Sequence, residues 1–221
     1  MAKLHKKHTL ATRWFHWLNF PLLAIMIWSG LLIYHAEPVY RVGIGDWTLI
    51  SFDKPFLKTI GIRLALAEGM GWHFFFGWLF AINGLLYALY MTITKKWSEI
   101  LPNQSSLKES LHVILHDLRI RKDPPPQAKF NGAQKFAYTG VIAMGLGSLL
   151  SGLAIYKPVQ LSFLVSAFGG YQSARWIHFW LCGLFVLFFV VHIMQVIRAG
   201  WNNFRSMITG HELVKEEAES V

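Results

Sequence analysis

The sequence predicts an all-α integral membrane protein: a four-helix bundle with one additional amphipathic helix on the cytoplasmic membrane surface. Two observations lead to this fold class. Apolar residues make up 54% of the 221-residue chain and charged residues only 15%, a composition typical of membrane proteins. The apolar residues also form four runs of about the twenty residues that a helix needs to cross a bilayer, near 15–34, 70–94, 134–156 and 176–198. We therefore expect residues 1–221 to form a single transmembrane domain.

The first apolar run follows a basic N-terminal segment, MAKLHKKHTL, which looks like the start of a signal peptide. The run is long for a signal peptide and lacks a small-residue cleavage site. It also carries His16 close to its start. We therefore expect this segment to be retained as the first membrane helix.

The connection at 35–69 is long and contains four basic and four acidic residues. Loops of this length inside compact domains are usually functional or disordered. Its aromatic and aliphatic residues fit either an aromatic belt at the lipid head groups or a docking surface for another protein. These residues are Trp47, Ile50, Phe52 and Phe56. His35, at the start of the connection, is expected to reach water.

The second connection, 95–133, contains a stretch with helical periodicity at 106–120. This stretch predicts an amphipathic helix that lies on a membrane surface. Its apolar residues are Leu107, Leu111, Ile114, Leu115 and Leu118. The three prolines at 124–126 then end the helix. The third membrane run has several glycines and no histidine, so we expect it to pack against other helices.

The distribution of lysine and arginine predicts the orientation in the membrane. With four membrane helices, both termini lie on the same side, and this side receives 15 of the 21 basic residues. The positive-inside rule therefore predicts that both termini are cytoplasmic. This asymmetry, together with contact with anionic membrane lipid, accounts for the formal charge of +9. No motif supports binding to nucleic acid.

The last apolar run, Trp176–Trp201, carries His178 and His192. Their separation of 14 residues is almost four helical turns, so both imidazoles leave the same face about 21 Å apart along the axis. An ionisable residue within a membrane span is costly and usually functional. Two histidines on one stripe therefore predict two sites, one in each leaflet.

Two further histidines lie at matching depths, His16 near the start of the first run and His73 near the start of the second. His16 and His192 then share the inner leaflet. His73 and His178 share the outer one. Two facing imidazoles are the axial ligands of a six-coordinate b-type haem, so the sequence predicts two haem b groups. The alternative is that each histidine is only hydrogen-bonded to a neighbouring helix.

Three features together resemble a known family: the first-run motif RWFHWLNF, the spacing of the last two histidines, and the segment KFNGAQKF before the third run. They resemble the cytochrome b561-like, di-haem cytochrome b subunits of bacterial formate dehydrogenases, nickel-iron hydrogenases and thiosulfate reductases, over nearly all four runs. The resemblance implies that the haem ligands are His16, His73, His178 and His192. It also implies a location in the bacterial inner membrane, electron exchange with quinone, and a periplasmic oxidoreductase partner that carries molybdenum or nickel-iron.

The same resemblance implies a quinone site beside the inner haem, with an asparagine from the segment before the third helix. Here that asparagine is Asn131. Asn131 and Gln134 can hydrogen-bond a quinone carbonyl, and Lys135 can pair with a haem propionate or a lipid phosphate. Arg13 and Arg175 are candidates to neutralise propionates. The alternative role for Asn131 is the N-cap of the third helix.

Two functions remain open at this point. The first is an electron-transfer subunit that exchanges electrons between an outer-face oxidoreductase and quinone at the cytoplasmic side. The second is a stand-alone superoxide:quinone oxidoreductase, because smaller four-helix b-type cytochromes resemble the chain in ligand layout. The two long connections favour a docking subunit. The four histidines at matching depths disfavour a haem-free anchor.

Overall fold

The computed structural model describes residues 2–117, 119–123 and 130–215. Contacts divide the chain into two compact units. Unit 1 comprises Met1–Leu85 and Ala199–Val221, and unit 2 comprises Leu86–Arg198. The second boundary lies next to Gly200, where the backbone leaves the helical conformation with φ 80° and ψ 174°.

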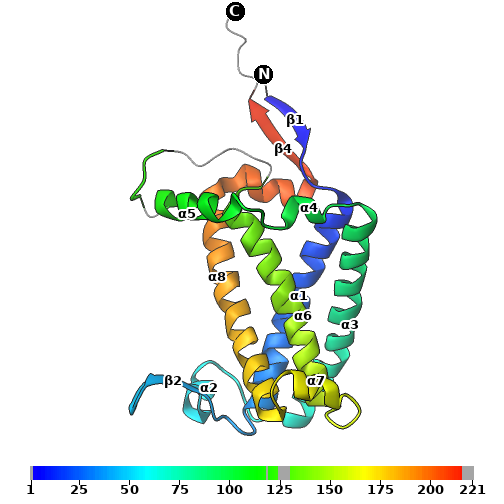
Figure 1. Cartoon of the computed structure of the whole chain (residues 1–221), viewed down its shortest axis with the longest axis vertical. Helices are drawn as coiled ribbons and strands as arrows, with labels where there is room; N and C mark the ends of the chain where they lie inside the picture. The colour runs from blue at the N-terminus through cyan, green and yellow to red at the C-terminus, as the bar shows by residue number, and fades with distance from the viewer. Residues whose placement is uncertain (1, 118, 124–129, 216–221) are drawn as a thin grey trace, which may run out of the picture. The chain divides into compact units, whose positions relative to one another are not determined.

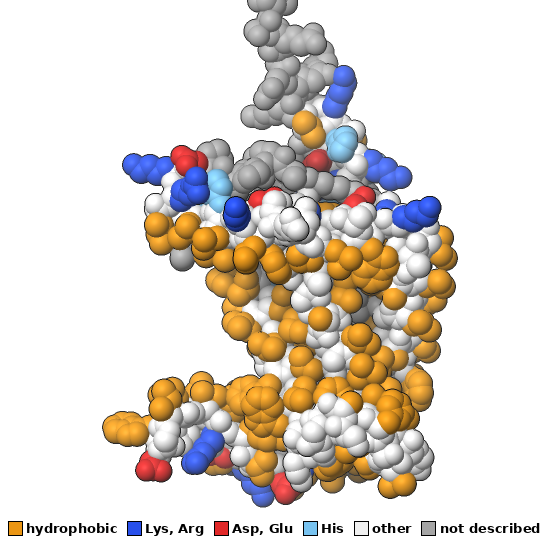
Figure 2. All heavy atoms as spheres, in the orientation of Figure 1, with side chains coloured by type: hydrophobic (Ala, Val, Ile, Leu, Met, Phe, Trp, Pro, Cys, Tyr) orange, Lys and Arg blue, Asp and Glu red, His pale blue; other side chains and the backbone are white. Residues whose placement is uncertain are grey.

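Within the described residues, four helices are long and apolar enough to cross a membrane. They are α1 (Leu10–Tyr34), α3 (Leu66–Ile93), α6 (Gly132–Tyr156) and α8 (Tyr171–Thr209). Large apolar side chains cover their surfaces (Figure 2), among them Trp78 and Ile197, which are 62% and 73% exposed. Such surfaces suit lipid tails, which are as apolar as leucine. The predicted class, an all-α membrane bundle, is confirmed.

In unit 1, α1 and α3 approach each other closely. A Cβ at Gly69 would lie only 2.8 Å from Leu32 Cβ, so the residue at this contact has to be small. A polar contact joins the same helices where Asn83 Nδ2 donates a hydrogen bond of 2.9 Å to Asn19 Oδ1, and Asn83 is buried. Side-chain amide bonds of this kind hold helices together within lipid.

The connection between α1 and α3 contains regular structure that the sequence did not predict. β2 (Arg41–Ile44) and β3 (Trp47–Ser51) form an antiparallel hairpin, and α2 (Lys54–Thr59) follows. A buried cluster of Leu57 and Ile62 with Leu32 fixes α2 against the end of α1.

The apolar residues of this connection differ in exposure. Trp47 and Ile50 of the hairpin are 81% and 47% exposed. Phe52 and Phe56 instead pack edge to face, with ring centroids 5.3 Å apart. The exposed hairpin residues therefore belong to an apolar surface that lipid or another protein can contact, and Val39, Ile60 and Leu64 outside the hairpin are also exposed.

The first and last strands of unit 1 pair with each other. β1 (Ala2–Lys6) runs antiparallel to β4 (His211–Lys215) (Figure 1). Lys7 Nζ donates a 2.6 Å hydrogen bond to Glu212 Oε2, and this bond holds the pKa of Glu212 below its ordinary value. The described N-terminal and C-terminal residues therefore lie side by side.

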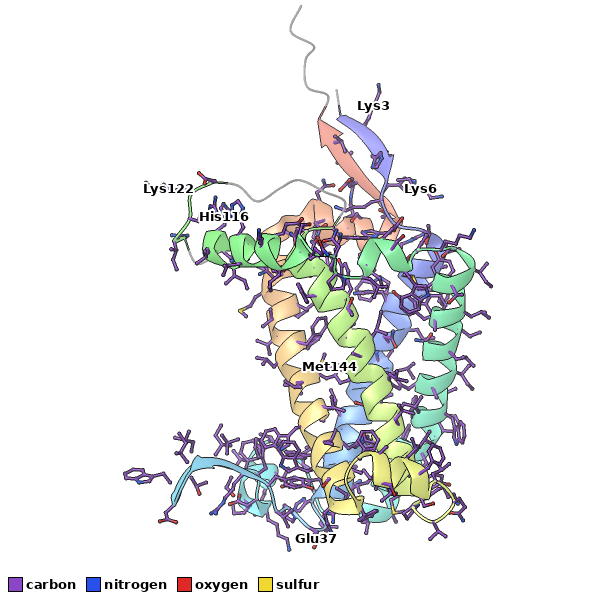
Figure 3. The ribbon with its side chains drawn as sticks, viewed as in Figure 1. Lys3, Lys6, Glu37, His116, Lys122 and Met144 are labelled. Carbon is purple, nitrogen blue, oxygen red and sulfur yellow. The ribbon has the colours of Figure 1, made fainter. Side chains whose placement is uncertain are left out.

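Unit 2 contains α6, most of α8 and three shorter helices. These are α4 (Trp97–Ile100), α5 (Ser106–Asp117) and α7 (Ser162–Ala167). Figure 1 shows α5 lying across the start of α6, whereas α7 lies at the other end of α6. Met144 lies halfway along α6 (Figure 3).

The predicted amphipathic helix is present as α5. Leu107, Leu111 and Ile114 present apolar side chains that are 69%, 57% and 51% exposed. Charged side chains occupy the opposite side of the helix (Figure 2), where His116 projects (Figure 3). This two-sided surface suits a helix at a lipid boundary. Leu118 and the prolines at 124–126 lie outside the described residues.

α6 begins with a capping box. Asn131 Oδ1 accepts the Gln134 backbone N–H, and Gln134 Oε1 accepts the Asn131 backbone N–H, each over 3.0 Å. Gly132 follows the cap and is buried against α5, where an added Cβ would lie 2.2 Å from the Ser106 carbonyl oxygen. The segment before the third membrane helix is therefore fixed by its own cap and by α5.

We expect Gly132→Ala to destabilise unit 2, because the new Cβ would overlap backbone atoms of α5. Overpacking of this kind costs about 1–3 kcal/mol. Gly140→Ala is the matched control on the same helix, since its added Cβ meets no described atom within 4 Å. Thermal unfolding of the two purified variants is the measurement. Equal melting temperatures would contradict the close contact between α5 and α6.

Candidate functional site

α8 carries two of the four predicted ligands, His178 and His192, both within unit 2. Their 14-residue separation corresponds to about 21 Å along one helix. Both side chains are half-buried. The His192 ring stacks on Phe188 with centroids 5.8 Å apart and an angle of 8° between the planes. The ring therefore has a defined orientation on the helix surface.

His73 of α3 is held by a serine of α1. His73 Nδ1 lies 3.0 Å from Ser29 Oγ, and Ser29 is fully buried. The Ser29 hydroxyl donates over 2.6 Å to the Ile25 carbonyl oxygen of its own helix. With its single proton used there, the hydroxyl accepts the proton of His73 Nδ1–H. Nε2 is then the unprotonated nitrogen, and its lone pair is available to bind a metal ion.

His178 of α8 has the same arrangement with a serine of α6. His178 Nδ1 lies 3.0 Å from Ser151 Oγ, and Ser151 donates over 2.7 Å to the Gly147 carbonyl oxygen. Ser151 is also fully buried. His178 therefore takes the same tautomer, with Nε2 unprotonated. Each unit thus contains one histidine oriented by one serine.

A glycine follows each serine and allows the imidazole to approach the helix. A Cβ at Gly30 would lie 3.3 Å from His73 Cε1, and a Cβ at Gly152 would lie 3.1 Å from His178 Cε1. Both distances are shorter than ordinary van der Waals contacts. A larger residue at either position would push the ring away from its serine.

The two serines belong to a repeated segment. Residues 29–34 read SGLLIY and residues 151–156 read SGLAIY, so they differ only at Leu32 and Ala154. Both differing residues are buried. The serines were missed in the sequence because serine is common where membrane helices pack. The repeat is the signal that could have revealed them.

His16 belongs to unit 1 and lies 13 residues before Ser29 on α1. Because His73 bonds to Ser29, His16 and His73 are about 20 Å apart along the direction of α1. This spacing nearly equals the value of about 21 Å in α8. Each unit therefore carries two histidines with the same axial separation.

α5 links the segment that carries the predicted quinone-site residues to the part of α8 that carries His192. Asp117, at the end of α5, accepts hydrogen bonds from Gln195 Nε2 over 3.0 Å and from Arg198 Nη2 over 2.9 Å. Gln195 lies one turn beyond His192 on α8. The other end of α5 contacts Gly132 at the start of α6. Asn131 and the His192 end of α8 are therefore tied to the same short helix.

Asn131 and Gln134 use their side-chain oxygens in the capping box. The NH2 group of each amide takes no part in the capping box. An NH2 group can donate a hydrogen bond to a quinone carbonyl. Gln134 is exposed, whereas Asn131 and Lys135 are half-buried. The helix-cap role considered for Asn131 is thus present, and it leaves the amide donors suited to a second role.

Each of the two predicted arginines precedes a histidine by one turn. Residues 13–16 read RWFH and residues 175–178 read RWIH, so Arg13 places a positive charge near His16 and Arg175 places one near His178. Arg13 Nη1 also donates to the Ile208 carbonyl oxygen. Arg13 therefore has a structural contact in addition to its charge.

The donor set fits haem better than a cluster of metal-binding side chains. No group of three or more histidine, cysteine, aspartate or glutamate residues that could hold a metal ion occurs in the described part of the chain. His112 and His116 of α5 have separate neighbours, since His112 Nε2 lies 3.1 Å from the Asp123 carbonyl oxygen. A b-type haem needs only two imidazoles, each with an unprotonated nitrogen. The tautomers fixed at His73 and His178 meet this requirement.

Four membrane-length helices that carry histidines at a repeated axial spacing, two of them hydrogen-bonded to buried serines, are features of a membrane cytochrome of the b type. Comparison with known families agrees with this class. The profile of the family described as "Prokaryotic cytochrome b561" matches residues 7–210, and the chain belongs to that family. It is a multi-pass prokaryotic membrane protein that binds haem and functions in electron transport.

A protein of Azospira oryzae, the "Putative protein-methionine-sulfoxide reductase subunit YedZ1", is similar to this chain. The two are 31% identical over 197 residues, which cover 89% of this chain and 92% of that protein. The similarity therefore extends over most of both proteins.

We expect Ser29→Ala and Ser151→Ala each to weaken haem binding, because Nδ1 would lose the partner that fixes the histidine tautomer. Loss of such a partner typically costs about 10–100-fold in affinity. Haem titration and the reduction potential of the bound haem are the measurements. The matched control is Ser206→Ala, since Ser206 is equally buried and bonds to the Asn203 carbonyl oxygen of its own helix. Serine variants that behave like this control would refute the positioning role.

Proposed function

We propose that this protein is a di-haem cytochrome b that transfers electrons between a periplasmic oxidoreductase and the membrane quinone pool. When bound, haem b supplies one-electron redox chemistry. The proposal rests chiefly on the nearly equal axial spacing of His16 from His73 and of His178 from His192. One histidine of each unit, His73 or His178, is held by a serine. Such repeated spacing suits two haems at two depths.

We assign His16 and His192 to the inner haem, and His73 and His178 to the outer haem. The two serine-held histidines have the same hydrogen-bond pattern, so they suit one common site. His16 lies about 20 Å from His73 along the helix direction, and His192 lies about the same distance from His178. The remaining two histidines, His16 and His192, therefore suit the second site.

Quinone is proposed to bind at the inner end, beside Asn131. Quinone reduction consumes two electrons and two protons, so its site needs a nearby haem, polar groups and access to water. The amide NH2 groups of Asn131 and Gln134 can donate to the quinone carbonyls. The link through α5 from Gly132 to Gln195, one turn beyond His192, supports this location.

The basic residues near the ligands are proposed to balance charge. Arg13 and Arg175 would neutralise haem propionates, because each lies one turn from a proposed ligand. Lys135 lies one turn beyond Asn131 and would pair with a propionate or a lipid phosphate. These roles concern haem retention and potential rather than ligation.

The proposed topology has both termini in the cytoplasm of a bacterial inner membrane, because 15 of the 21 basic residues then lie on that side. The Azospira protein is named as a subunit of a reductase. This name supports a complex with a catalytic partner, for which we propose a molybdenum or nickel-iron enzyme. The exposed hairpin around Trp47 provides an apolar surface for docking.

The second candidate function is a stand-alone superoxide:quinone oxidoreductase, which the four-helix ligand layout favours. The two candidates differ in what the purified chain does alone. A stand-alone enzyme would reduce a quinone analogue with superoxide and no other subunit. A subunit would require its co-purified partner for rapid electron exchange on the outer face.

The ligand assignment predicts which haem each variant loses. His73→Ala and His178→Ala should each remove the same haem and preserve the other, because an axial ligand of only one iron is lost. Haem content, absorption spectra and a potentiometric titration of each variant are the measurements. His112→Ala on α5 serves as the control and should keep both haems. If His73→Ala and His178→Ala lost different haems, the pairing would be wrong.

The quinone site can be separated from the helix cap by two substitutions of Asn131. Asn131→Ser keeps a good N-cap but removes the NH2 donor, whereas Asn131→Leu removes both. We expect both variants to slow haem oxidation by a quinone analogue by about 100-fold, since a lost donor to a developing oxyanion costs about 2–4 kcal/mol. Only Asn131→Leu should also lower the melting temperature.

The control measurement for these variants is the haem spectrum, which should stay unchanged because no ligand is touched. Normal quinone kinetics in Asn131→Ser would limit this residue to helix capping. Slow electron entry from an outer donor, together with normal quinone kinetics, would locate quinone elsewhere.

A further inference from the structure

Unit 1 has a surface pocket of about 610 Å³ at the end of α1. Its basic lining residues are Lys54, Lys58 and Arg63, and Ile62 and Leu64 add apolar surface. His35, the residue that caps the C-terminus of α1, also lines the pocket. Since α1 crosses the membrane, the pocket lies where the chain leaves the hydrocarbon core.

His35 is the unexpected feature of this pocket. Its position after a membrane run predicted contact with water, but the side chain is only 8% exposed. Its Nδ1 atom is buried and has no hydrogen-bond partner among the described residues. A buried polar atom without a partner is costly. His35 lines the pocket, so a small turn of its ring toward the pocket would let a bound ligand supply the missing partner.

The charges around the pocket define the kind of ligand. Lys54 and Lys58 lie one turn apart on α2, and neither forms an ion pair within the part of the chain that the structure describes. Arg63 is paired with Glu68. Two lysines without an ion pair and a buried histidine therefore line the same pocket, and this combination suits an anion.

We propose that this pocket binds the phosphate of an acidic phospholipid head group. Lys54 and Lys58 attract the phosphate, and His35 Nδ1–H donates to one of its oxygens. Ile62 and Leu64 contact the glycerol and the first methylenes of the acyl chains. The ligand class is thus an anionic phosphodiester with an apolar tail.

Two observations favour a lipid over a soluble anion. The pocket adjoins the end of a membrane helix, where lipid head groups are abundant. Its lining also includes apolar residues, which a soluble phosphate would leave in contact with water. α2 is fixed on the buried cluster of Leu57 and Ile62, so the two lysines stand on a rigid support.

Native mass spectrometry of the full-length, haem-loaded protein tests this site by counting retained phosphatidylglycerol against phosphatidylcholine. Lys54→Gln with Lys58→Gln should weaken phosphatidylglycerol retention by about tenfold or more. Lys3→Gln with Lys6→Gln removes the same charge from β1 and should leave retention unchanged. His35→Phe keeps the bulk of the ring and removes its nitrogens, so it should also lose the preference for phosphatidylglycerol.

Equal loss in both lysine pairs would reveal only general charge attraction and would overturn the site. A folded His35→Phe variant, with normal haem spectra and normal retention, would do the same. Displacement of phosphatidylglycerol by millimolar inorganic phosphate would reassign the pocket to a soluble anion. Retention that is equal for both lipids, with capture of an acidic peptide of the catalytic partner instead, would reassign it to protein docking.

Discussion

The hydrogen bond between a buried serine and a histidine Nδ1 is the interaction on which the proposed haem sites depend. In a bilayer, water is absent from the helix contacts, so an imidazole has to find its partner on a neighbouring helix. Ser29 and Ser151 each donate to a carbonyl of their own helix and accept from a histidine of the next. The helix backbone thus decides which imidazole nitrogen carries the proton. Close packing permits this only because a glycine follows each serine.

A second constraint acts on the proposed quinone end of unit 2. Asn131 caps α6, and the next residue, Gly132, contacts α5. Asp117 ties the far end of α5 to α8 just beyond His192. A shift of α5 would therefore disturb the start of α6 and the last turns of α8 together. The amphipathic helix is thus part of the site's support as well as a surface element at the lipid boundary.

The sequence predicted the features that local patterns determine. Apolar runs located α1, α3, α6 and α8, and helical periodicity located α5. The spacing of His178 and His192 follows from helix geometry alone. The features that depend on a distant partner were missed. Nothing local distinguishes Ser29 from any other membrane serine, and the burial of His35 depends on α2 folding back onto the end of α1.

The two repeated segments diverge at the residue where each helix leaves the membrane. Tyr34 is followed by the buried His35, whereas Tyr156 is followed by Lys157, whose ammonium lies 4.7 Å from the tyrosine ring centroid. The shared part includes the serine and glycine that hold an imidazole, a demand common to both units. After the first repeated segment the chain continues into the hairpin and the basic pocket, and after the second it continues into α7. The residues that orient a histidine are therefore common to both repeated segments, whereas the residues that follow them differ.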